Sequence, residues 1–235
     1  MKITVLTICP EQFGDFRKTP LIARAEDSGL LELKIIDIRE YAPGSFRQVD
    51  DSPYGGGAGM ILRCQPVLDA LDAVRTEDSH TVILAPVGKT YTQSDAHRLA
   101  QLDHLILICG HYEGIDARIY EYVDEIVSIG DYVLTGGELP AMVLTDAVVR
   151  LTEGALRRES TAEESFENGI LEYPQYTRPV VFEGKEVPPV LLSGNHEEIR
   201  KWRHQAALER TAQMRPDLLA GYSGDDAGPE RKTEG

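Results

Sequence analysis

Short apolar runs alternate with segments of helical periodicity through about the first 150 residues of the chain. Apolar runs of this length, bounded by turn-forming residues, are typical of buried strands. The predicted strands are Lys2–Ile8, Leu31–Asp37, Thr81–Pro86, His104–Cys109 and Glu125–Ile129. The predicted helices are Gln65–Val74, Ser94–Gln101, Asp116–Tyr122 and Glu138–Leu151. Strands that alternate with helices favour an α/β fold, in which helices cover the faces of a parallel sheet.

The pattern changes after Leu151, where the sequence loses its apolar periodicity and becomes acidic up to Gly169. Such a composition is expected of a flexible linker or lid. A proline-rich stretch follows, and Glu197–Leu208 repeats apolar positions at helical spacing. We therefore predict a first domain at 1–156, a flexible linker or lid at 157–170 and a C-terminal domain at 171–235, with a disordered tail from about residue 223.

Length, composition and cysteine spacing indicate the class of protein and the compartment in which it works. The chain of 235 residues can bury one core plus a small satellite. No stretch approaches the roughly 20 apolar residues of a membrane helix, and Met1–Phe13 reads as a first strand, not a signal segment. Cys9, Cys64 and Cys109 lack the spacing of a disulfide framework or a zinc site. We expect a soluble cytoplasmic protein.

The net charge of −15 argues against a general electrostatic attraction to nucleic acid. Basic residues are nevertheless weighted toward the C-terminal part, so a basic face remains possible alongside a merely solvated helix surface. These residues are Arg150, Arg157, Arg158, Arg178, Arg200, Lys201, Arg203 and Arg210.

Three glycine-bearing segments are predicted to follow strands and precede helices: Leu84–Tyr91, Cys109–Asp116 and Ser128–Pro140. Glycine lets backbone amides approach a ligand without obstruction by Cβ. Loops at the carboxyl ends of neighbouring parallel strands converge where such sheets bind ligands. Any one segment could be a plain tight turn, but three together indicate a binding site. None is a GxGxxG or P-loop motif, and His111 is the one histidine placed near this site.

Several longer motifs are more specific. They are PYGGGAGM at 53–60, CGHYEGID at 109–116, SIGDYVLTGGELPAM at 128–142, YTRP at 176–179, VPPVLLSGNH at 187–196 and IRKWR at 199–203. In this order and spacing the chain resembles the bacterial tRNA (guanine-N1)-methyltransferases, the TrmD family. The resemblance extends from Met1 to about Leu219 and implies a SPOUT-type fold, in which a parallel sheet carries a trefoil knot, with a small helical C-terminal domain and a homodimeric assembly.

The resemblance also implies that the glycine loops bind S-adenosyl-L-methionine. The residues that match the family's cofactor contacts are Leu84, Pro86, Gly88, Gly110, Glu113, Ile129, Gly130, Asp131, Tyr132, Val133, Leu134, Gly136 and Gly137.

The implied reaction is methyl transfer to N1 of guanine 37 of tRNA, beside the anticodon, which maintains the reading frame. N1 carries a proton, so the reaction needs a base, and negative charge develops on the neighbouring carbonyl oxygen. The family's arginine matches Arg150, and its catalytic aspartate matches Glu164, in a Glu-Ser-Phe triplet where Asp-Ser-Phe is usual. Glu163 is the local alternative to Glu164.

The family's tRNA contacts match Asp50, Tyr54, Gly55 and Gly59, with Arg200, Lys201 and Arg203 as candidates in the C-terminal domain. Magnesium is expected from the family, but its ligands cannot be assigned from the sequence. Three other interpretations remain: a nucleotidyl- or phosphotransferase using Lys89, a knotted methyltransferase for another RNA base, and a catalytically weakened RNA-binding homologue.

Overall fold

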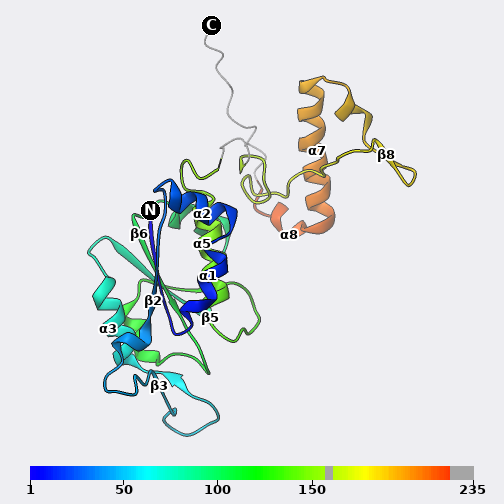
Figure 1. Cartoon of the computed structure of the whole chain (residues 1–235). Helices are drawn as coiled ribbons and strands as arrows, with labels where there is room; N and C mark the ends of the chain where they lie inside the picture. Colours follow the sequence, from blue (N-terminus) through cyan, green and yellow to red (C-terminus); the bar gives the residue numbers. More distant parts are fainter. Residues whose placement is uncertain (157–160, 223–235) are drawn as a thin grey trace. The chain divides into compact units, whose positions relative to one another are not determined.

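The computed structural model of the chain describes residues 1–156 and 161–222. The chain divides into two compact units, Met1–Leu156 and Arg157–Gly235, which we call the sheet unit and the C-terminal unit (Figure 1). The predicted tail from residue 223 and the start of the predicted linker, 157–160, lie outside the described residues.

The sheet unit is built on five parallel strands. They are β1 (Lys2–Thr7), β2 (Glu32–Asp37), β5 (Ser79–Thr90), β6 (His104–Cys109) and β7 (Glu125–Ser128). Their order across the sheet is β2-β1-β6-β5-β7. The predicted parallel α/β fold is confirmed, because each predicted strand corresponds to one of these five.

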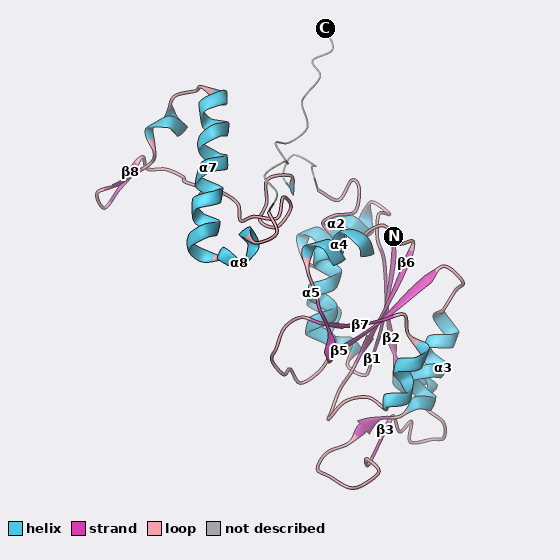
Figure 2. Cartoon of the chain, turned by 180° about the vertical axis from the view of Figure 1, so that it is seen from behind, coloured by secondary structure: helices cyan, strands magenta, loops and turns pink. Residues whose placement is uncertain are grey.

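Helices cover both faces of the sheet, with α3 (Cys64–Val74) on one face (Figure 2). The opposite face carries α1 (Phe13–Phe16), α2 (Pro20–Asp27), α4 (Gln93–Leu99) and α5 (Glu138–Val149). Strand residues alternate between the two apolar cores, so Leu84 packs toward the α5 side while Ile83 packs toward the α3 side. This alternation follows from the two-residue period of a strand.

Shorter elements complete the sheet unit. Strands β3 (Asp50–Asp51) and β4 (Ile61–Leu62) pair in antiparallel fashion and close the glycine-rich loop between them. The 3-10 helices are η1 (Pro10–Gln12), η2 (Ile38–Tyr41) and η3 (Ala117–Tyr122).

Two sequence predictions are corrected by the fold. The predicted helix Asp116–Tyr122 is the 3-10 helix η3, whose first turn forms around the Asp116 side chain as it accepts a hydrogen bond from the Arg118 amide. The segment Leu84–Tyr91 is not a loop that leads from a strand into a helix. Most of it belongs to β5, which continues to Thr90 past an irregularity in its pairing with β7 between Leu84 and Lys89.

The C-terminal unit is organised around the long helix α7 (His196–Met214), which contains the predicted helix Glu197–Leu208. The other elements are β8 (Val181–Phe182), β9 (Lys185–Glu186), η4 (Pro189–Leu192) and α8 (Pro216–Leu219). Ile170 and Ala207 are buried in this unit, and the Leu171 amide donates a hydrogen bond to the Thr211 hydroxyl. Within the described part of the chain, no helix combines the length and apolar character needed to cross a membrane.

Candidate active site

A cavity of about 350 Å³ opens at the carboxyl ends of β6 and β7, beside residues 83–87 of β5. This size lies within the range of roughly 300–1,000 Å³ seen for small-molecule sites. The lining is largely apolar side chain and backbone, with Glu113 and His111 among its few ionisable groups. The position matches the ligand crevice expected in an open parallel sheet.

Most of the predicted cofactor residues line this cavity together. They are Leu84, Pro86, Gly110, Glu113, Ile129, Gly130, Tyr132, Val133, Leu134, Gly136 and Gly137. The other two predicted residues, Gly88 and Asp131, are not among its lining residues.

Gly88 lies in β5 where this strand passes very close to β7. A Cβ atom at this position would lie 2.5 Å from the Val127 nitrogen and 2.6 Å from the Ile126 carbonyl carbon, both of which are backbone atoms. Glycine at 88 is therefore explained by the contact between strands. Asp131 is exposed beside the cavity-lining Gly130 and Tyr132.

Gly136 and Gly137 hold the segment before α5 against the end of β6. The Gly137 amide donates a 2.7 Å hydrogen bond to the Gly110 carbonyl, and His111 forms a bridge with Gly136. A Cβ atom on Gly137 would lie 2.7 Å from the Cys109 Cα atom. The two glycines thus allow backbone to pack on backbone at the cavity wall.

Gly130 shapes the turn after β7. Its φ of +146° is a conformation that side chains disfavour, and the Ser128 hydroxyl lies 3.2 Å from the Gly130 amide, which donates to it. The Tyr132 amide in turn donates to the Gly130 carbonyl. This turn brings the Tyr132 ring, which is about half exposed, to the cavity.

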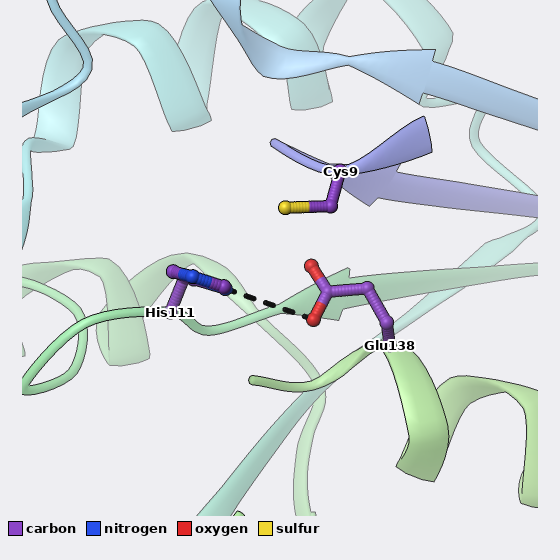
Figure 3. A group of neighbouring side chains, drawn as sticks. All are labelled: Cys9, His111 and Glu138. Carbon is purple, nitrogen blue, oxygen red and sulfur yellow. Dashed lines mark ion pairs between the residues drawn. The ribbon is translucent and has the colours of Figure 1, made fainter. Parts of the chain in front are cut away.

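A buried polar cluster lies beside the cavity, at the start of α5. The Thr7 hydroxyl donates a 2.7 Å hydrogen bond to Glu138 Oε1, and His111 Nδ1 lies 3.8 Å from Glu138 Oε2. Cys9 is the third neighbour, and Figure 3 shows its sulfur, the His111 ring and the Glu138 carboxylate facing a common space. Burial, followed by the charge of Glu138, raises the pKa of the Cys9 thiol and raises that of Cys109 well above its usual range.

The sequence analysis did not identify Thr7 and Glu138 as site residues, and it assigned no ligand role to Cys9. Glu138 is far from Thr7 and Cys9 in the sequence, and the pairing of β1 with β6 and the hydrogen bond from Gly137 to Gly110 bring them together. A glutamate directly after two glycines at a helix start was the one available signal, since carboxylates are favoured there.

The ionisable groups around the cavity bear on the phosphotransferase interpretation. That chemistry needs a lysine free to hold phosphate. Lys89 Nζ instead forms a 2.9 Å ion pair with Asp95 Oδ1, in the capping box at the start of α4. Lys89 is also not among the residues that line the cavity, which weakens this interpretation.

The two predicted catalytic residues lie in different units. Arg150 is the C-cap of α5, and its amide donates to the Asp146 carbonyl. Glu164 lies in the C-terminal unit, in a series of turns where its amide donates to the Thr161 carbonyl. These turns are held to the unit by the Glu172 amide, which donates to the Ser165 hydroxyl. Glu164 is half-buried.

Glu163, the alternative base, has a structural role in the C-terminal unit. Its carboxylate accepts a 2.9 Å hydrogen bond from the Tyr173 hydroxyl and lies 3.3 Å from the Arg203 guanidinium. Burial, together with this hydrogen bond, raises the pKa of Tyr173. The guanidinium also stacks over the Tyr173 ring at 4.7 Å. These contacts tie Glu163 to Arg203 on α7.

The predicted tRNA contacts form two groups. Asp50 lies in β3, while Tyr54, Gly55 and Gly59 follow in the loop before β4, where the Tyr54 side chain is fully exposed. Arg200, Lys201 and Arg203 lie on α7. Lys201 is paired with Glu197 at 3.0 Å and Glu198 at 3.2 Å, whereas Arg200 is exposed.

The fold and the cavity together define the class: a parallel α/β protein whose glycine-rich loops form a small-molecule site at the carboxyl ends of its strands. Comparison with known proteins makes the assignment specific. The sequence profile described as tRNA (Guanine-1)-methyltransferase TrmD matches residues 1–221. The chain belongs to the TrmD family.

Similar proteins carry the same name. The chain is 53% identical over 230 residues to the tRNA (guanine-N(1)-)-methyltransferase of Heliobacterium modesticaldum, covering 94% of this chain and 85% of that protein. It is 53% identical over 226 residues to the one of Moorella thermoacetica, covering 94% of this chain and 90% of the relative. For the one of Dictyoglomus turgidum the identity is 50% over 220 residues, with 93% and 90% covered.

Proposed function

We propose that the chain transfers a methyl group from S-adenosyl-L-methionine to N1 of guanine 37 in tRNA, beside the anticodon, and so helps to maintain the reading frame. Membership of the TrmD family over nearly the whole chain is the observation that carries this proposal. Relatives at 50–53% identity are named for methylation of guanine N1 in tRNA. A cytoplasmic location is proposed with it, because tRNA is the substrate.

The cavity has the features that a methyl donor of this kind requires. S-adenosyl-L-methionine supplies a methyl group activated by a positively charged sulfur, and its adenine is read by hydrogen bonds to its edge. The Gly110, Gly136 and Gly137 segments present backbone to the cavity without a Cβ in the way. Apolar side chains such as Leu84 and Ile129 can cover the adenine faces and exclude water. These residues therefore fit the donor.

We further propose that the sheet unit has the SPOUT-type trefoil knot and that the protein acts as a homodimer. Close backbone contacts support the knot: Gly88 packs on β7, and Gly137 bonds to Gly110. The first contact involves the Leu84–Tyr91 segment, and the second joins the Ser128–Pro140 segment to the Cys109–Asp116 segment. These are the three segments that a knot would interlace.

In the proposed reaction Glu164 accepts the proton of guanine N1, which frees the nitrogen lone pair for methylation. Arg150 stabilises the negative charge that develops on the neighbouring carbonyl oxygen. The extra methylene of Glu164, compared with the family's usual aspartate, shifts the carboxylate by about one bond length. Displacements on the order of 1 Å can cost about 100-fold in rate, so the turns around Glu164 have to compensate for the longer side chain.

Magnesium remains a prediction from the family resemblance. Mg²⁺ prefers a shell of oxygen ligands. Among the described residues, the one group of three or more candidate ligands is Cys9, His111 and Glu138, which offers a single carboxylate. This set does not fit Mg²⁺, and we derive no step through that ion.

The proposed function is tested with unmodified tRNA transcripts that differ only at position 37. The purified chain is incubated with methyl-labelled S-adenosyl-L-methionine and a transcript carrying guanine or adenine at that position. Label is expected on the guanine transcript alone. Label on both transcripts would indicate another target base, whereas transcript binding without label would indicate an RNA-binding protein that has lost catalysis.

A further inference from the structure

Cys9, His111 and Glu138 bring three different metal-binding groups into one place. Their donor atoms, the thiol sulfur, an imidazole nitrogen and a carboxylate oxygen, all lie within 4.8 Å of one another. The three residues come from separate parts of the chain, following β1, following β6 and opening α5. Sequence spacing gave no metal signature for this reason.

The register of the sheet explains why two of the three side chains meet. Strands β1 and β6 are parallel neighbours, and Leu6 is paired with Ile108. Cys9 and His111 each lie three residues beyond these paired positions, so both follow the carboxyl ends of their strands at the same end of the sheet. The hydrogen bond from Gly137 to Gly110 then places Glu138 directly beside them.

Hydrogen bonds to Thr7 orient Glu138 and Cys9, and the donor nitrogen of His111 is buried beside them. Glu138 is 2% exposed, and its Oε1 accepts from the Thr7 hydroxyl, which leaves Oε2 directed toward His111. The Thr7 hydroxyl also accepts a hydrogen bond from the Cys9 amide, so one side chain orients two members of the group. His111 Nδ1 is buried and has no hydrogen-bond partner. Buried polar atoms of this kind are normally satisfied.

We propose that Cys9, His111 and Glu138 form a three-ligand site for a divalent transition metal of the Zn²⁺ class. Thiolate, imidazole and carboxylate are the ligands zinc takes in proteins, with bonds of about 2.0–2.3 Å in a tetrahedral arrangement. Such bonds put the donor atoms roughly 3.3–3.6 Å apart. The present separations, 3.8 Å between His111 Nδ1 and Glu138 Oε2 and at most 4.8 Å between any two donor atoms, are longer, so the side chains have to move closer as the metal binds. The thiol proton is released to solvent as the metal binds, and no electron is transferred.

The proposed metal site adjoins the cavity, but none of its three residues is a predicted contact of the methyl donor. His111 and Gly136 line the cavity, and a Cβ atom on Gly136 would collide with the facing atoms of both His111 and Glu138. A bound metal would fasten the end of β1, the loop after β6 and the start of α5 to one another. It would therefore stabilise the wall that holds the methyl donor.

The test is a titration of the metal-free, full-length chain with Co²⁺, which replaces Zn²⁺ and reports a thiolate ligand through a charge-transfer band. We expect one Co²⁺ per chain with this band, displaced by Zn²⁺ and not by Mg²⁺. Cys9→Ser should remove the band and weaken Co²⁺ binding by about tenfold or more. The matched control is Cys64→Ser, because Cys64 is also a half-buried cysteine and should leave the band intact.

Absence of the band in the unchanged protein, or its persistence in Cys9→Ser, would overturn the proposal. X-ray absorption of the Zn²⁺-loaded unchanged protein gives a second test that needs no folded variant. One sulfur neighbour at about 2.3 Å is expected beside nitrogen and oxygen neighbours. A shell of nitrogen and oxygen alone would refute the site.

Discussion

The side chain of Asp95, in the first turn of α4, is held by several partners at once. Its carboxylate accepts hydrogen bonds from the Thr92 amide and hydroxyl and forms an ion pair with Lys89. Burial alone would raise the pKa of Asp95, but the bonds from Thr92 and Lys89 outweigh it and lower the pKa below its ordinary value. The ionised form is therefore the one that stabilises the fold.

Asp95→Asn should lower the free energy of unfolding at pH 7 by about 1–2 kcal/mol, as loss of a helix cap does. Because the folded pKa is lowered, the contribution of Asp95 is complete above the unfolded pKa of about 3.9 and is lost as pH falls through the folded value. Urea unfolding of both proteins from pH 7 to pH 3 measures the difference. A difference that grows toward low pH would contradict this account.

Glu164→Gln tests the proposed base at the same scale. The single-turnover methylation rate should fall by about 10²–10⁴-fold, the usual contribution of a general base. Glu164→Asp, which restores the family's usual residue, should keep methylation measurable. The control is Glu163→Gln, which removes the contacts to Tyr173 and Arg203 and should affect stability more than rate. Full activity in Glu164→Gln would show that Glu164 is not the general base.

At the scale of elements, the hydrophobic pattern located the five strands and the helices α3, α4, α5 and α7, because each has a regular apolar period. It missed α1 and α2, which are short, and it took η3 for an α-helix. The extension of β5 past Gly88 was also missed, since it depends on contact with β7. Most residues that the family resemblance assigns to the methyl donor line one cavity, and the sequence pointed to this region because glycines after strands are visible in it. The Cys9, His111 and Glu138 group was not visible in the sequence, since strand register and the packing of α5 create it.

Gly137→Ala tests the packing of α5 against the end of β6. The new methyl group would meet the Cys109 and Gly110 backbone, which cannot move without shifting β6. Overpacking of this kind costs about 1–3 kcal/mol, and calorimetry should show weakened binding of S-adenosyl-L-methionine. Gly14→Ala in α1 is the control, because a Cβ there meets nothing within 4 Å. Equal binding by both variants would contradict the proposed cavity wall.

At the scale of the whole molecule, an acidic chain has to bind an acidic RNA. The net charge is −15, and on α7 Lys201 and Arg203 are already paired with glutamates. The exposed ion pair between Lys201 and Glu197 contributes little to stability, so a phosphate group can replace Glu197 as the partner of Lys201. Binding should then come from a few local contacts and weaken with salt.

Arg200→Ala should weaken tRNA binding and reduce the slope of log affinity against log salt by about 0.7–0.9, the value for one lost phosphate contact. Arg24→Ala in α2 is the control, because Arg24 is an exposed arginine that donates to the Pro20 carbonyl within its own helix and is not a predicted tRNA contact. Filter binding at several salt concentrations measures both slopes. An unchanged slope in Arg200→Ala would remove this residue from the RNA interface.

The chemical identity of the methylated nucleoside tests the proposed function most directly. A tRNA transcript with guanine at position 37 is incubated with the chain and S-adenosyl-L-methionine, digested to nucleosides and separated by chromatography with mass detection. The proposed reaction yields 1-methylguanosine, which is absent when the transcript carries adenine at position 37. Methylguanosine modified at another atom, or a methylated nucleoside other than guanosine, would contradict it.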